Sequence, residues 1–254
     1  FHAGGGLSIA DDGLMAGDIA LTTKSNDKNI QGSSGFMEGT IRLMPDGPKQ
    51  AVVTDLQLAD LSIAEQLTLK FGEVSSTILI DQGQPHISAK IRLSDLAHPY
   101  LQANHVELDL EHQDGRIDYN LDLESVDYQP YGLSLTGHSE PLDSNARKIT
   151  LTIDGRIAEH PLRTSNPITS ILGETGFSVQ PFRLLYGDGV LEASLKSDQG
   201  ILEAALTADT LDLTPIKTFI PDTPAIGTIS GQFKLASRPT VSYTHLTLPT
   251  MDSV

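Results

Sequence analysis

The sequence predicts an all-β protein whose strands pair sequentially in an antiparallel meander. The first observation is a period-two alternation of apolar and polar residues, which is typical of half-buried strands. The second is turn chemistry, namely Gly, Asp, Asn and Pro, at intervals of about 8–15 residues. The third is the near absence of helical periodicity. Together they favour roughly a dozen or more short strands joined by short turns.

The clearest element is a hairpin over residues 106–124. Apolar residues alternate with acidic ones on both sides of Gln113-Asp114-Gly115-Arg116, and Asp-Gly is a strong hairpin signal because Gly accepts a positive φ. Folded this way, one face is apolar and the other acidic. The apolar positions are Val106, Leu108, Leu110, Ile117, Tyr119, Leu121 and Leu123.

The other elements follow the same pattern, in segments that we delimit as 1–154, 155–183 and 184–240. Residues 1–154 alternate throughout and end with Ile149, Leu151 and Ile153. Residues 155–183 contain three prolines and read as an irregular joint, a linker or a lid. Alternation returns in residues 184–240, at Leu191, Leu195, Leu202, Leu206, Ile229, Phe233 and Leu235.

One short helical turn is expected between Thr214 and Ile220. Thr214 suits the N-cap and Pro215 the first helical position, while Pro221 ends the turn.

Composition limits the function classes. The 254 residues carry a net charge of −16, which argues against nucleic acid or an anionic membrane surface as a direct partner. Aromatic residues make up 5% and Trp is absent, which disfavours a carbohydrate-enzyme cleft. There is no Cys, so thiolate chemistry is excluded. No apolar run is long enough for a transmembrane helix.

Motifs for chemistry are weak, and we expect no enzyme activity, metal or cofactor. Gly4-Gly5-Gly6 lacks the Lys of a phosphate loop, and residues 118–129 lack the Gly and Glu of a calcium loop. Gly137–Pro141 misses the last Gly of a nucleophile elbow. His98, His105 and His112 are too far apart on strands to share one metal.

In residues 202–235, Leu211-Asp212-Leu213 precedes Phe219-Ile220-Pro221, and Ile226-Gly227-Thr228-Ile229-Ser230-Gly231 then begins an outgoing strand. With this pattern the C-terminal third resembles the AsmA-like family, which includes the translocation and assembly module subunit TamB. The resemblance covers about residues 184–238, and residues 1–183 share only the general style.

The resemblance implies an elongated, curved sheet that forms an open apolar groove, with one or two short helical turns. It further implies the middle segment of a periplasm-spanning bridge, anchored in the inner membrane, that carries phospholipid between the inner and outer membranes, supports outer-membrane protein assembly and secretion, or does both. The implied partners are phospholipid acyl chains and a TamA-like barrel-assembly protein. The anchor and the C-terminal part that meets this protein are expected to be missing from the fragment.

The apolar positions of the hairpin and of residues 149–153 and 191–235 would line such a groove. Two alternatives stay open from the residues alone. The stripes would equally suit a closed β-sandwich or β-solenoid core. The chain would also suit a secreted adhesin or passenger-type β-solenoid that binds a surface polymer.

Residues 241–254 differ from everything before them. They resemble translated sequencing-adapter readthrough, and we expect a non-native tail outside the fold. The alternative is a genuine last strand.

Overall fold

A computed structural model describes most of the chain. The described residues are 2–9, 13–25, 34–63, 66–99, 101–126, 130–214, 226–238 and 241–247. They contain strands and turns and no helix, so the all-β prediction is confirmed. No helix in this part of the chain has the length and apolarity to cross a membrane. The chain divides into two compact units, residues 1–126 and 127–254.

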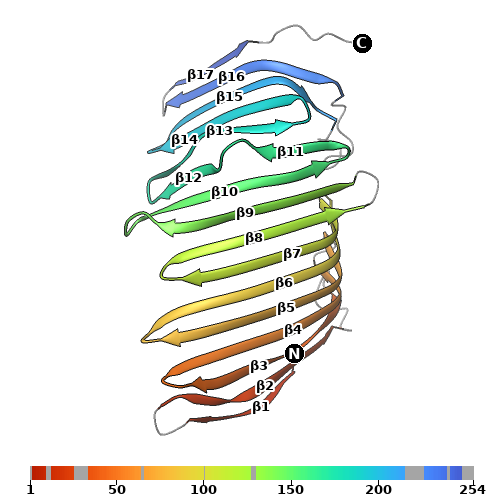
Figure 1. The fold of residues 1–254 in the computed structure, drawn as a ribbon, viewed down its shortest axis with the longest axis vertical. Coiled ribbons are helices and arrows are strands. Elements are labelled where there is room, and N and C mark those ends of the chain that lie inside the picture. The colour runs from red at the N-terminus through yellow and green to blue at the C-terminus, as the bar shows by residue number, and fades with distance from the viewer. Residues whose placement is uncertain are drawn as a thin grey trace. The chain divides into compact units, whose positions relative to one another are not determined.

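Unit 1 (residues 1–126) is an antiparallel meander in which each strand pairs with the next (Figure 1). Its strands are β1 (His2–Ile9), β2 (Met15–Ser25), β3 (Ser34–Asp46), β4 (Lys49–Ile63), β5 (Leu67–Asp81), β6 (Gln84–His98), β7 (Leu101–Gln113) and β8 (Arg116–Ser125). The predicted turn at 113–116 is confirmed. Asp114 and Gly115 both have positive φ, as a two-residue hairpin turn of the primed type requires.

Unit 2 (residues 127–254) is also antiparallel, with one interrupted strand. Its strands are β9 (Tyr131–Pro141), β10 (Ala146–Ile157), β11 (His160–Thr164), β12 (Ile168–Gly173), β13 (Gly176–Tyr186), β14 (Gly189–Asp198), β15 (Ile201–Asp212), β16 (Thr228–Arg238) and β17 (Val241–Thr247). β11 and β12 both pair with β10 on one side and with β13 on the other, so together they occupy one position in the sheet.

Residues 155–183, predicted as an irregular joint, therefore consist mainly of β-structure. The interruption lies at Ser165-Asn166-Pro167, where proline offers no N–H to a ladder. The boundary between the two compact units lies elsewhere, after Val126. The predicted helical turn after Thr214 lies outside the described residues.

The expected non-native tail is described in part. Residues 241–247 form β17, which pairs with β16. A free sheet edge offers its N–H and C=O groups to almost any extended segment, and β17 occupies that edge beside β16.

Four neighbouring strands of unit 1 each carry one residue that the ladder skips, namely Asp60, Lys70, Asp95 and Asn104. We call these four positions the bulge row. Because of the extra residue, apolar side chains three positions apart share a face, as Leu93 and Leu96 do. A Cβ at Gly72 would lie 3.1 Å from Cδ2 of both Leu69 and Leu93, so this face is packed across the bulge row. Such bulges bend and twist strands.

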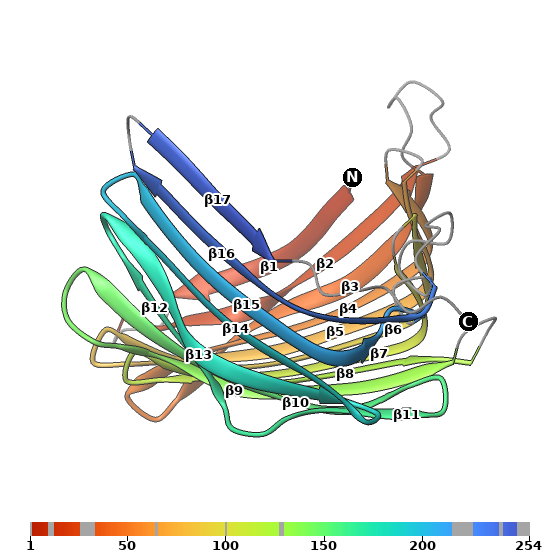
Figure 2. The same cartoon turned by 90° about the horizontal axis from the view of Figure 1, so that it is seen from above.

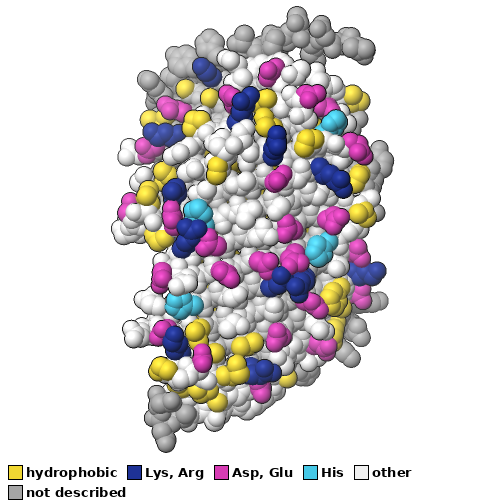
Figure 3. Space-filling view, viewed as in Figure 1, with side chains coloured by type: hydrophobic (Ala, Val, Ile, Leu, Met, Phe, Trp, Pro, Cys, Tyr) yellow, Lys and Arg dark blue, Asp and Glu magenta, His cyan; other side chains and the backbone are white. Residues whose placement is uncertain are grey.

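The strands of each unit are bent along their length (Figure 2). Figure 3 views the outer side of the bend, where acidic and basic side chains are scattered over the surface. Each sheet encloses few side chains, and no described side chain is completely buried.

Candidate functional site

The apolar face of unit 1 follows from the register of its strands. Residues directly opposite each other in a ladder point to the same face, and each strand alternates between the two faces. In the hairpin of β7 and β8 the opposite pairs are Val106 with Leu123, Leu108 with Leu121, Leu110 with Tyr119 and His112 with Ile117. All seven predicted hairpin positions thus lie on one face.

The same face continues across β2–β6. One row of opposite residues runs Leu21, Gly39, Leu56, Val74, Ile91, Leu108 and Leu121. A second row runs Met37, Leu58, Gly72, Leu93, Val106 and Leu123. These rows form the apolar face of unit 1.

Unit 2 has an apolar face of the same kind. The opposite residues in one row are Val179, Leu195, Ala204 and Leu235, and those in the next are Phe182, Ala193, Leu206 and Phe233. Ile149, Leu151 and Ile153 share this face through the ladders of β10 with β9 and β12. Leu191, Leu202 and Ile229 also have the parity of this face. The ten predicted positions in unit 2 therefore lie on one face.

Among the described strands, no other strand covers either apolar face. Apart from isolated contacts, each strand touches only its ladder neighbours. Apolar side chains consequently stay partly exposed, with Leu206 at 40% and Ile229 at 41%, whereas Val106, beside the bulge row, is only 7% exposed. These faces contrast with a closed sandwich core, in which such side chains would be enclosed by a second sheet.

Three tyrosines on the apolar faces have pKa values raised by burial. Burial raises the pKa of the Tyr119 phenol in unit 1. Burial also raises the pKa of Tyr131 and of Tyr186 in unit 2, and the nearby Asp212 carboxylate contributes at Tyr186. The Tyr186 hydroxyl donates a hydrogen bond of 3.3 Å to the carbonyl of Ile157.

The opposite faces of both sheets are polar. In unit 1 the Lys90 ammonium contacts the carboxylates of Glu107 and, at 3.0 Å, Asp109. Arg92 lies 3.5 Å from the same Glu107 carboxylate. These bonds raise the pKa of Lys90 and lower that of Glu107. Lys90 and Arg92 are thus paired with carboxylates on the polar face of unit 1.

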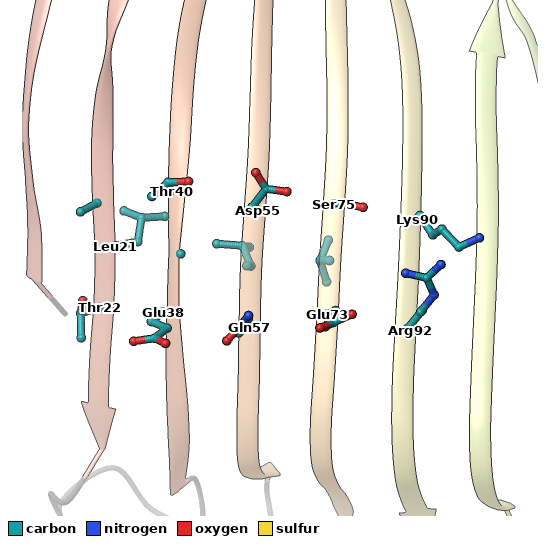
Figure 4. Close-up of a pocket in the computed structure, with 14 residues that line it drawn as sticks. Leu21, Thr22, Glu38, Thr40, Asp55, Gln57, Glu73, Ser75, Lys90 and Arg92 are labelled. Atoms are coloured by element: carbon teal, nitrogen blue, oxygen red, sulfur yellow. The ribbon is translucent and has the colours of Figure 1, made fainter.

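The polar faces are also where the hollows lie. A hollow of about 620 Å³ in unit 1 is lined mainly by polar residues of β2–β6, including Glu38, Asp55, Glu73, Lys90 and Arg92, along with the row of Leu56 (Figure 4). A hollow of about 860 Å³ in unit 2 is lined by side chains of the polar rows, including Lys196 and Glu203, along with the row of Val179. Neither hollow coincides with the predicted lining residues as a set.

Comparison with known proteins identifies no relative. No family model, no curated protein and no solved structure matches the chain.

The weak chemical motifs lie on ordinary strands. Gly4-Gly5-Gly6 belongs to β1, and Asp118, Asn120 and Asp122 belong to the polar face of β8. Asn120 there donates a hydrogen bond of 2.7 Å to Asp122. Within the described residues, no group of three or more His, Asp or Glu side chains is placed to hold a metal ion.

The predicted lining residues include none of the apolar-face residues of β2–β6, and in unit 2 they omit Arg147. It precedes Ile149 and Leu151 at the same parity in β10, so the alternation already placed it there. Its neighbour Lys148 has the opposite parity and pairs with Glu140 at 3.2 Å on the polar face.

Proposed function

We propose that the chain is the middle segment of a non-catalytic bridge that carries phospholipid between the inner and outer membranes of a Gram-negative bacterium. In this proposal the apolar faces hold the acyl chains, the segment lies in the periplasm, and missing parts provide the membrane anchor and a TamA-like partner. Support of outer-membrane protein assembly is the other role that the resemblance implies for such a bridge, beside lipid transport or in its place. The proposal joins the AsmA-like resemblance of residues 184–238 to one structural observation, the uncovered apolar face of each unit.

The physical argument is the cost of leaving such a face in water. Burying hydrocarbon gains about 0.8 kcal/mol per methylene, so ten acyl methylenes laid against an apolar face contribute roughly 8 kcal/mol. Continuous rows of aliphatic side chains contact hydrocarbon without directional bonds, which permits a chain to slide. A lipid therefore suits these faces better than a polar polymer.

No observation favours the alternative adhesin. A β-solenoid stacks its rungs in parallel, whereas neighbouring strands in the described part of the chain pair antiparallel. An adhesin of another architecture would use polar or aromatic side chains, and the apolar faces are mainly aliphatic.

The test places a charge on each apolar face. We expect Leu108→Arg and Leu206→Arg, combined in one chain, to abolish transfer of acyl-labelled phospholipid between vesicles, because a charge on the face repels hydrocarbon. The sheet should remain folded by circular dichroism, since the introduced side chains reach water. The matched control combines Thr77→Arg and Thr207→Arg on the polar faces and should transfer lipid like the original chain.

Two results would overturn the proposal. Transfer by the doubly charged variant at the original rate would show that the apolar faces carry no lipid. Unfolding of this variant but not of its control would show that the faces are closed cores, because an unpaired buried charge is costly.

A further inference from the structure

Arg147 is an exception on an otherwise uncharged surface. Among the described strand residues that the ladders pair, the register places no Asp, Glu or Lys on the apolar face of either unit. The same assignment places one Arg there, opposite Pro141 in β9 and Leu172 in β12. A single fixed positive charge thus stands in the last row of the apolar face of unit 2.

The position of the guanidinium is fixed by a neighbouring residue on the same face. Nε of Arg147 donates to the Ser139 hydroxyl at 3.0 Å, and Nη2 donates to the Ser139 carbonyl at 3.2 Å. Beside it, Leu172 is 53% exposed and its ladder partner Phe177 is 40% exposed. The Arg147 guanidinium, held by Ser139, therefore lies in the same row as two exposed apolar side chains.

We propose that Arg147 pairs with the phosphate of a bound phospholipid whose acyl chains lie over Ile149, Leu151 and Ile153. The inference rests on the proposed function and names the chemical group that the site of unit 2 recognises. Charge complementarity carries it, because a phosphodiester joined to hydrocarbon is an anion at the end of an apolar body. Arg suits phosphate since its planar fork matches two phosphate oxygens and keeps its charge at every physiological pH.

The surroundings fix the direction of the lipid. The turns next to Arg147 carry Asp143 and Glu174, whose carboxylates accept hydrogen bonds from Asn145 at 2.8 and 3.0 Å. These two carboxylates repel a phosphate placed beyond the end of the strands, so the phosphate lies on the apolar face at Arg147. From there to Ile153 the strand offers roughly 20 Å of apolar surface, at about 3.3 Å per residue.

The experiment compares two probes that differ only in the head group. The probes are phosphatidylethanolamine and diacylglycerol with the same labelled acyl chains, offered to the whole chain from phosphatidylcholine vesicles. We expect the original chain to take up the phospholipid in preference, and Arg147→Gln to lower phospholipid uptake roughly tenfold without changing diacylglycerol uptake. Arg147→Lys keeps the charge and should retain most of the preference.

Lys148→Gln is the matched control, because it removes the same charge from the adjacent residue on the opposite face. It should leave uptake of both lipids unchanged. The role of Arg147 would be overturned if Arg147→Gln lost uptake of both lipids equally. It would also be overturned if Lys148→Gln lost as much phospholipid uptake as Arg147→Gln. A folded Arg147→Lys variant that lost phospholipid uptake as completely as Arg147→Gln would overturn it too. Failure of the original chain to take up either lipid would instead overturn the proposed function itself.

Discussion

The apolar faces of units 1 and 2 arise from the same alternation but differ in continuity. In unit 1, β3–β7 run for 13 to 15 residues, and the bulge row crosses four of them at the same level. In unit 2 the strands are shorter, β11 and β12 share one position, and the bulges at 179–182 and 208–211 each affect one strand of a pair. In unit 1 the two apolar rows thus cross β3 to β8 without meeting a divided strand.

The difference suggests a division of roles within the proposed function. Because the bulges are aligned, the two apolar rows of unit 1 stay opposite each other from strand to strand, which suits acyl chains lying along them. The interruption in unit 2 accompanies an Arg on the apolar face. A continuous face suits sliding hydrocarbon, whereas an interrupted one can hold a polar group at a fixed position.

The largest expected effect tests the close approach of strands in unit 1. A Cβ at Gly39 would lie 2.1 Å from the Asp55 carbonyl oxygen and 2.7 Å from Cδ2 of Leu56, whereas a Cβ at Gly132 in unit 2 meets nothing within 4 Å. We expect Gly39→Ala to cost about 2–3 kcal/mol by forcing β3 and β4 apart. Gly132→Ala should stay within about 0.5 kcal/mol of the original chain. Urea unfolding measures both, and equal midpoints would contradict the tight β3–β4 contact.

Many of the structural features of the two units could be predicted from the alternation of apolar and polar residues. The hairpin of β7 and β8, its Asp-Gly turn and the shared face of its seven apolar positions follow from residue types alone. The same holds for the Gln199-Gly200 turn, in which both residues have positive φ. Local pattern suffices there because side-chain direction in a strand depends only on parity.

The length of the strands was not predictable in the same way. The sequence suggested short strands because the alternation breaks between Leu58 and Leu61 and between Leu93 and Leu96. The ladder continues through these breaks, since each partner strand skips a residue at the same level. Such matching is a property of neighbouring strands and not of one segment. The signal available in the sequence was that pairs of apolar residues three positions apart recur in adjacent strands.

A smaller effect on the free energy of unfolding comes from backbone strain at the bulges. One substitution adds strain in unit 1, and another relieves strain in unit 2. Asp95 in unit 1 has a φ of 53° and Thr210 in unit 2 a φ of 48°. Asn and Asp tolerate this left-handed conformation, whereas β-branched residues do not. We expect Asp95→Val to destabilise unit 1 by about 1–2 kcal/mol and Thr210→Asn to stabilise unit 2 by about 1 kcal/mol.

Asp95→Asn separates strain from charge. It keeps the tolerated φ while removing the carboxylate that lies 3.7 Å from Lys70, an exposed pair worth little. Its urea midpoint should match that of the original chain. If Asp95→Asn is as destabilised as Asp95→Val, the ion pair and not the backbone governs the bulge row.

The smallest effect is the pH dependence of the polar faces, where unit 1 has a network and unit 2 has isolated pairs. Lys90 lowers the pKa of Glu107 below its ordinary 4.5, and the two carboxylates raise the pKa of Lys90 above 10.5. Folding therefore favours the ionised carboxylate above pH 4.5, and this contribution is lost as the pH falls through the lowered pKa. The contribution of Lys90 is present below pH 10.5 and is lost as the pH rises through the raised pKa.

Glu107→Gln should narrow the difference in urea midpoint between neutral and acidic pH. Added salt should reduce this difference in the original chain, because it screens the ion pairs. Glu192→Gln in unit 2 removes a single exposed partner, 3.6 Å from Arg183, and is the matched variant for comparison. Identical profiles for both variants would mean that the two Lys90 bonds contribute no more than one isolated pair, and the polar faces of the two units would then be equivalent.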